Sequence, residues 1–192
     1  LGNPKAVIIA AAEDSWEHTI VPRLMAAGAD LSLIFRLDVI AANGSDSMLQ
    51  LPIDLIELQR VVSESSAALV MLDPLLSRVA AELDTHKDSD VRLALEPVVK
   101  LADVTGAAVI GLIHVNKSAS TDPLTMLMGS RAFAAVARSV LFVMTDPNDP
   151  TKRMMGQAKN NLGRGDLPTL SFHIQTVKVA DSPEGDITTA KV

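Results

Sequence analysis

The chain has 192 residues, of which 48% are hydrophobic and 21% are charged, so it is long enough for one domain with a real core. A net charge of −6 argues against a surface that coats nucleic acid, and 3% aromatic residues argue against a platform that stacks single-stranded bases. The absence of cysteine excludes disulfides and thiolate metal sites, no apolar stretch has the length of a membrane span, and we expect a cytoplasmic location.

The first part of the sequence alternates strand and helix patterns. The apolar run 6–11 predicts a buried strand. Asp14 is placed to cap a helix that reaches about residue 27, and Pro22 should kink this helix or divide it into two pieces. A short strand and a second helix are expected next, over residues 31–37 and 52–65.

The strand predicted over residues 67–73 is the most informative segment. An apolar run leads into Asp73, which suggests a strand buried on both faces inside a parallel sheet. Pro74 cannot donate to a sheet ladder, so Asp73 should stand at the carboxyl end of the strand. Taken alone, this acid suits two roles equally: a ligand of the water shell of Mg²⁺ beside a phosphate chain, or a solvated residue that starts a loop.

The second part of the sequence continues the alternation and then changes to antiparallel patterns. A helix from about Asp90 to Thr105 is expected, with Pro97 as an internal irregularity and Gly106 as its stop, and a third buried strand over 107–113. The remaining expectations are a helix over 130–138, a strand over 140–144, late antiparallel strands over 154–158 and 170–179, and a loose tail after residue 181. We therefore predict an α/β fold, a mostly parallel sheet with helices on both faces and antiparallel late strands.

Three of the predicted strands end in polar residues. Glu13 and Asp14 follow the first of these strands, Asp73 ends the second, and His114 follows the third. If the strands are neighbours, these groups converge on one edge of the sheet. An acid for Mg²⁺, a second acid that orients a water, and a polar contact to the γ-phosphate are what nucleotide hydrolysis requires.

At this point the chain resembles a known family, the RecA-like P-loop ATPases, and within it the branch of the RepA-type plasmid replication helicase and the ATPases of phages and mobile elements. The resemblance runs from the first strand to Gly163. Its most specific segments are Ala12-Glu13-Asp14-Ser15, Leu72-Asp73-Pro74-Leu75, His114-Val115-Asn116-Lys117, Gly129-Ser130-Arg131-Ala132-Phe133 and Ala158-Lys159-Asn160-Asn161-Leu162-Gly163.

The resemblance implies a role for each residue of the site. Glu13 would orient the attacking water, with Asp14 beside it at the nucleotide, and Asp73 would be the Walker B acid that holds Mg²⁺ through water. His114 would be the sensor on the γ-phosphate side, together with Asn116. The implied cofactors are ATP and Mg²⁺.

The resemblance also implies a homo-oligomeric ring, expected to be a hexamer, in which a neighbouring subunit completes each site. Arg138 matches the position of the arginine that acts in the neighbour's site, and Arg131 is the rival. Lys159 is either a second basic residue near the neighbour's nucleotide or an ordinary surface lysine. The loop 118–129 corresponds to a segment that faces DNA in such rings, but it contains no arginine, so we do not expect DNA contact there.

The P-loop motif G-x-x-x-x-G-K-[ST] does not occur in these 192 residues. We expect residues 1–180 to be a RecA-like core without its first strand, P-loop and following helix, and 181–192 to be the tail. Either a longer protein carries the motif ahead of Leu1, or the domain is degenerate. We favour the first explanation, because a degenerate domain would not need Glu13, Asp73, His114 and Arg138.

Two functional hypotheses follow. The first is the core of an oligomeric, Mg²⁺-dependent ATPase in DNA replication or recombination, helicase-like, whose isolated chain binds ATP weakly or not at all. The second is a non-catalytic RecA-like assembly or helicase-loader module. The Rossmann fingerprint, the G-x-S-x-G nucleophile elbow and a metal-binding spacing of the histidines are all missing, so other enzyme classes have no support in the sequence.

Overall fold

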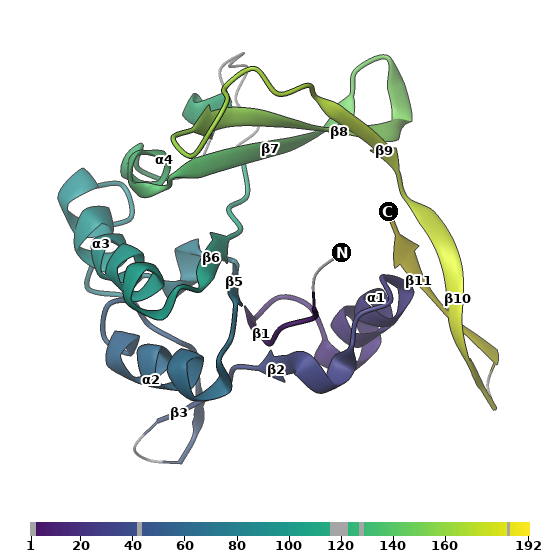
Figure 1. The fold of residues 1–192 in the computed structure, drawn as a ribbon, viewed down its shortest axis with the longest axis horizontal. Helices are drawn as coiled ribbons and strands as arrows, with labels where there is room; N and C mark the ends of the chain where they lie inside the picture. Colours follow the sequence, from purple (N-terminus) through teal and green to yellow (C-terminus); the bar gives the residue numbers. More distant parts are fainter. Residues whose placement is uncertain (1–2, 42–43, 116–122, 127–128, 184) are drawn as a thin grey trace. The chain divides into compact units, whose positions relative to one another are not determined.

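A four-stranded parallel sheet forms the centre of the first of two units into which the chain divides (Figure 1). The computed structural model describes residues 3–41, 44–115, 123–126, 129–183 and 185–192. The first unit comprises residues 1–13 and 32–136, and the second comprises 14–31 and 137–192. The sheet has the order β2-β1-β5-β6, with β1 at Val7–Ala11, β2 at Ile34–Arg36, β5 at Leu69–Asp73 and β6 at Ala108–Gly111.

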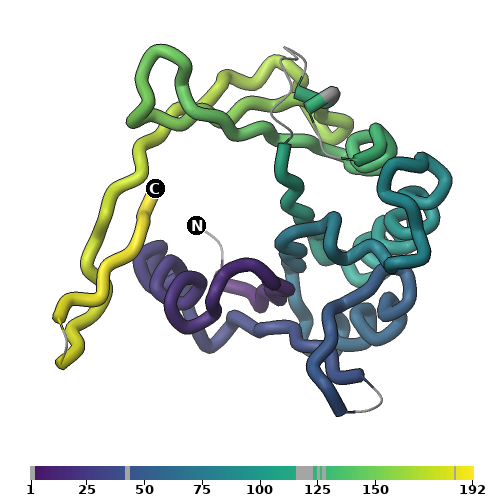
Figure 2. The backbone as a smooth tube through the Cα atoms, turned by 180° about the vertical axis from the view of Figure 1, so that it is seen from behind, coloured from purple at the N-terminus to yellow at the C-terminus, as the bar shows by residue number. Residues whose placement is uncertain are grey.

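The core lies between one face of this sheet and two helices, α2 (Leu55–Ser65) and α3 (Asp88–Thr105). Ile8 of β1 is level with Val70 of β5, and both are fully buried in that face. Figures 1 and 2 show α2 and α3 lying side by side, and their buried side chains belong to the same core. Each fully buried aliphatic side chain contributes about 1.5–3 kcal/mol, so this layer is the main source of stability in the first unit.

The strand β6 corrects one expectation. It was predicted to be a buried strand, but Ile110 is 48% exposed and most of its other residues are exposed too. Within the described parts of the first unit β6 pairs with β5 alone, so it is an outer strand of this sheet. The apolar run 107–113 does not distinguish an outer strand from a central one, because it only records side-chain polarity.

The two long helices end in the way their sequences predict. Helix α3 stops at Gly106, whose φ of +71° is a left-handed conformation that glycine adopts without strain. Pro97 does not interrupt α3, which is continuous from Asp88 to Thr105.

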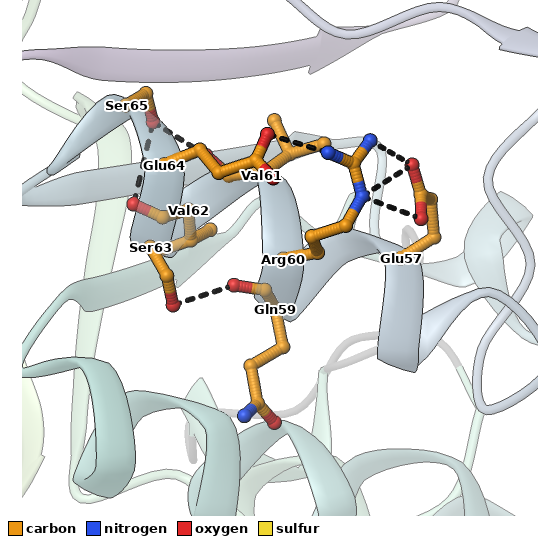
Figure 3. Close-up of polar contacts among 8 residues, drawn as sticks. All are labelled: Glu57, Gln59, Arg60, Val61, Val62, Ser63, Glu64 and Ser65. Atoms are coloured by element: carbon orange, nitrogen blue, oxygen red, sulfur yellow. Dashed lines mark hydrogen bonds and ion pairs between the residues drawn. The ribbon is translucent and has the colours of Figure 1, made fainter.

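On the solvent side of α2, Arg60 lies between Glu57 and Glu64, and the Ser63 and Ser65 hydroxyls donate to carbonyls of the preceding helical turn (Figure 3).

A short helix, α4 (Ala132–Val136), packs directly against α3. The Ser130 hydroxyl bonds to the Asp88 carboxylate and accepts from the Ala132 N–H at 2.9 Å, so one side chain caps α4 and fixes it to the start of α3. The remaining elements of the unit are the hairpin β3 (Val39–Ile40) and β4 (Asp46–Ser47) and the 3₁₀ turns Leu31–Leu33, Leu76–Arg78 and Pro123–Thr125.

The second unit begins with a helical segment that Pro22 divides, as the sequence predicts. A π-type turn at Trp16–Ile20 leads into α1 (Val21–Ala26), with Pro22 in the first turn of α1, where its missing N–H costs nothing. The expected N-cap was wrong: Ser15, not Asp14, caps this segment by accepting the His18 N–H at 3.2 Å.

The rest of the second unit is antiparallel. Strands β7 (Ser139–Asp146), β8 (Asp149–Asn160) and β9 (Leu170–His173) form one sheet, and β10 (Gln175–Ser182) and β11 (Gly185–Lys191) form a hairpin. The expected loose tail is wrong, because residues 185–191 pair with β10 and the hairpin packs against α1. The single late strand expected over 170–179 is in fact two strands in different sheets.

Candidate functional site

The carboxyl ends of β1, β5 and β6 meet at one edge of the parallel sheet, as expected. The Ala12 N–H donates to the Asp73 carbonyl at 3.0 Å, which joins the end of β1 to the end of β5. On the other side, the Leu112 N–H donates to the Leu72 carbonyl at 2.9 Å, and the Leu75 N–H returns to the Leu112 carbonyl at 2.8 Å. Asp73 therefore stands between the residues that follow β1 and β6, in a backbone bonded on both sides.

The Glu13 and His114 side chains meet across the end of β5. The Nε2 atom of His114 lies 3.1 Å from Oε2 of Glu13, and the carboxylate can only accept, so the imidazole donates. The two side chains are 57% and 70% exposed. An exposed pair of this kind contributes at most about 1 kcal/mol. It can therefore open at little cost when either group takes another partner.

The Asp73 residue combines a rigid backbone with a half-buried position. Pairing of β5 ends here because the buried Pro74 follows, as the sequence predicts. Among the described residues no group of three or more acidic, histidine or cysteine side chains surrounds a possible metal position. A single carboxylate fits Mg²⁺ well, because this ion keeps most of its waters and takes one or two protein oxygens beside substrate phosphates.

Arg78 was not among the predicted site residues, although its side chain reaches the same edge of the sheet. Its Nη2 donates to the Ala10 carbonyl at 3.1 Å and lies 3.5 Å from the Asp73 carbonyl, and the residue is only 3% exposed. Burial lowers the pKa of this guanidinium, and the charge of Asp73 opposes that effect. The available signal was a charged residue inside the segment 74–80, where Ser77 is the one other polar residue.

The other predicted site residues are more dispersed. Asn116 lies outside the described residues, and Arg131 is exposed just before α4. Three belong to the second unit. There Asp14 pairs with Arg23 at 2.8 Å, the Lys159 ammonium donates to the Ala137 carbonyl at 2.8 Å, and Arg138 is exposed with its carbonyl bonded to Asn161. The structure thus brings together Glu13, Asp73 and His114 and leaves the roles of the others as predictions.

Comparison with known proteins identifies the family. Residues 2–120 match a family model described as an AAA domain, and this is more than half of the chain. The chain belongs to the AAA domain family. A search of curated proteins found no match.

The solved structure of the RadB recombinase supports the fold of this AAA domain. The two sequences are 18% identical, and the TM-score is 0.55. The match covers 89% of this chain and 76% of the RadB chain. This likeness confirms the predicted RecA-like α/β fold, with its parallel sheet, helices and later antiparallel strands. Among the described helices, none combines the length and apolar character needed to cross a membrane.

Proposed function

We propose that this AAA domain is the core of a Mg²⁺-dependent ATPase that acts as an oligomer in DNA replication or recombination, in the RepA-type helicase branch. The observation that carries the proposal is the meeting of Glu13, Asp73 and His114 at the carboxyl edge of the sheet. In open α/β sheets this edge is where ligands bind. The absence of cysteine is consistent with the reducing cytoplasm that we propose as its location.

Each of the three side chains has a distinct task in this proposal. Asp73 would hold the water shell of Mg²⁺, and this ion would neutralise the charge that develops on the phosphate oxygens. Glu13 would orient the attacking water and accept its proton. His114 now donates to Glu13, and it would turn this donor toward a γ-phosphate oxygen, which releases the Glu13 carboxylate for the water.

In this proposal the phosphate cradle comes from outside these 192 residues, which contain no P-loop motif. We propose that a strand, P-loop and helix ahead of residue 1 in a longer protein supply it. The pairing of β6 supports this idea, because within the described first unit β6 uses only the edge that faces β5. A further parallel strand on the other edge would bring its own carboxyl end beside His114, one strand away from Asp73.

Charge stabilisation from a second subunit completes the proposal. Arg138 is exposed, as a residue that enters a neighbour's site must be, and Arg131 is the exposed alternative. Lys159 would act in the same neighbouring site, and we propose a hexameric ring as the assembly. DNA is a possible partner of such a ring, although the net charge of −6 gives it no support.

The decisive experiment is ATP turnover by the protein that carries this domain, with Glu13→Gln as the test and Glu17→Gln as the matched control. Both residues are exposed acids, and Glu17 lies only four positions further along the chain. We expect Glu13→Gln to lower kcat about 10²-fold or more with little change in KM, because a general base acts in the transition state. Equal turnover in Glu13→Gln and Glu17→Gln would refute the assignment.

The second candidate function is a non-catalytic assembly or helicase-loader module. It is favoured by the missing P-loop motif in these residues. A wild-type protein that forms oligomers but hydrolyses no nucleoside triphosphate would support this alternative. The sequence directly ahead of Leu1 is a further test, since a Walker A motif there favours the enzyme.

A further inference from the structure

The buried side chain of Arg78 has no place in the roles described above, although it contacts the site's backbone. Its Nη2 atom lies 3.1 Å from the carbonyl oxygen of Ala10 and 3.5 Å from that of Asp73. These two carbonyls belong to neighbouring strands, β1 and β5, at their carboxyl ends. One guanidinium group therefore joins the strand that leads to Glu13 with the strand that carries Asp73.

We propose that Arg78 is a positioning residue, which fixes the ends of β1 and β5 against each other and thereby sets the separation of the Glu13 and Asp73 side chains. We call these contacts of Arg78 with Ala10 and Asp73 the strand clamp. The proposal rests on the proposed ATPase function, and it assigns no contact between Arg78 and the substrate.

The backbone around Arg78 makes the strand clamp rigid. Arg78 ends the 3₁₀ turn Leu76–Arg78, and its carbonyl accepts the Leu51 N–H at 2.6 Å. The Ala80 N–H donates back to the Leu51 carbonyl at 3.0 Å, so the segment after the turn is held on both sides of Arg78. Both contacts come from the single nitrogen Nη2, so the ammonium of a lysine can replace them only in part and only if it reaches the same position.

The energetic cost of Arg78 also indicates a role other than general stability. The residue is 3% exposed, and its Nε atom has no hydrogen-bond partner among the described residues. A buried charge with an unsatisfied donor is costly, and apolar side chains of similar volume often replace buried charges without loss of stability. What an apolar residue cannot do is donate to two carbonyls at the strand ends.

The backbone bond from the Ala12 N–H to the Asp73 carbonyl offers a direct measure of the strand clamp. It joins the same two strands, and its acceptor is the Asp73 carbonyl oxygen that also lies 3.5 Å from the guanidinium. The bond from the Leu112 N–H to the Leu72 carbonyl joins β5 to β6 on the other side. The strand clamp does not include this bond, so it serves as the internal reference. Amide hydrogen exchange measures both bonds separately.

The experiment compares Arg78→Met and Arg78→Lys with Arg60→Met, which removes an exposed arginine from α2 (Figure 3). In Arg78→Met we expect exchange of the Ala12 amide to rise about tenfold or more relative to the Leu112 amide, since a hydrogen bond to a charged group is lost. We expect kcat to fall about tenfold or more with KM for ATP nearly unchanged. Arg78→Lys should recover part of both effects, and Arg60→Met should change neither.

The possible outcomes separate the strand clamp from the proposed function. Equal acceleration of both amides, or a lower kcat with unchanged Ala12 exchange, would overturn the positioning role. If the wild-type protein hydrolyses no ATP, the proposed function fails, and selective exchange at Ala12 still supports the clamp as a structural link. Selective exchange at Ala12 together with the loss of kcat supports both.

Discussion

The contact between Glu13 and His114 joins two exposed side chains that follow β1 and β6, two strands that do not pair with each other. Burial and further hydrogen bonds, which make polar pairs stabilising, contribute little at such exposure. The pair therefore has a small role in folding, and its chemistry is available to a ligand. A polar pair that contributes little to the free energy of folding and is accessible to a ligand has the properties of a functional pair rather than a structural one.

We expect His114→Ala to separate these roles. The free energy of unfolding should change by less than about 1 kcal/mol, because an exposed pair is lost and no cavity forms. Turnover should fall about 10²-fold, the usual cost of removing one donor from developing charge. Urea unfolding and steady-state kinetics measure the two quantities, and the exposed His18→Ala serves as the control. A loss of several kcal/mol would show that His114 is structural.

The start of α3 carries a carboxyl group, that of Asp90, whose pKa is lowered in the folded state. Asp90 accepts the Asp84 N–H at 3.0 Å and the Ser89 hydroxyl at 2.9 Å, and these bonds keep the pKa of Asp90 below its ordinary value of 3.8, with a smaller effect of Lys87. A lowered pKa in the folded state stabilises the fold above the unfolded pKa, and this contribution disappears as the pH falls through the folded value.

The corresponding test is the thermal stability of Asp90→Asn against wild type as a function of pH. We expect the wild type to have the higher Tm from about pH 5 to 7, and the difference to shrink below about pH 4, where the carboxyl protonates. A control variant, Asp103→Asn, lies in the last turn of the same helix. A difference between wild type and Asp90→Asn that grows on acidification would contradict the assignment.

At the scale of elements, the agreement between sequence and structure depends on how much of each element is apolar. The runs that became β1 and β5 were predicted because both are strongly apolar, and Asp73 does end β5 while Glu13 follows β1 by two residues. Strand β11 was missed, because Gly185–Lys191 has little apolar alternation and takes its partners from β10 and α1. Arg78 was missed for a similar reason, since its nearest acceptor, the Ala10 carbonyl, lies 68 positions away in the sequence.

The β10–β11 hairpin leads to a prediction about α1. Because the hairpin packs on this helix, removal of residues 185–192 should expose α1, which has only six residues and is too short to be stable alone. We expect amide exchange in Val21–Ala26 to accelerate strongly while exchange in α3 stays as in wild type. The mild variant Ile187→Ala, which keeps the backbone pairing, should give a smaller effect in the same direction. Unchanged exchange in α1 would show that the helix is held by other contacts.

At the scale of the whole molecule, the proposed site has two parts: side chains within one subunit and side chains that a neighbouring subunit contributes. The parallel sheet orders Glu13, Asp73 and His114 within the first unit, while Arg138 and Lys159 are in the second unit and act, in our proposal, on a neighbouring subunit. An assembly is set by contacts between copies, and the sequence of one copy predicts it only through family resemblance. The fold is therefore confirmed by the structure of one chain, whereas the ring is still a proposal.

The final prediction tests this division of labour by mixing two inactive variants of the protein that carries this domain. Asp73→Asn removes the metal-holding acid within a subunit, and Arg138→Ala removes the group offered to the neighbour. In a ring with head-to-tail interfaces and equal random mixing, about a quarter of the sites combine an intact Asp73 with a neighbour's intact Arg138. ATP turnover should therefore recover to about a quarter of the wild-type value, whereas each variant alone stays inactive. A mixture of Arg131→Ala with Asp73→Asn tests the rival arginine in the same way. If Arg138 acts within its own subunit, the first mixture gains no activity, because every subunit then lacks one of the two groups.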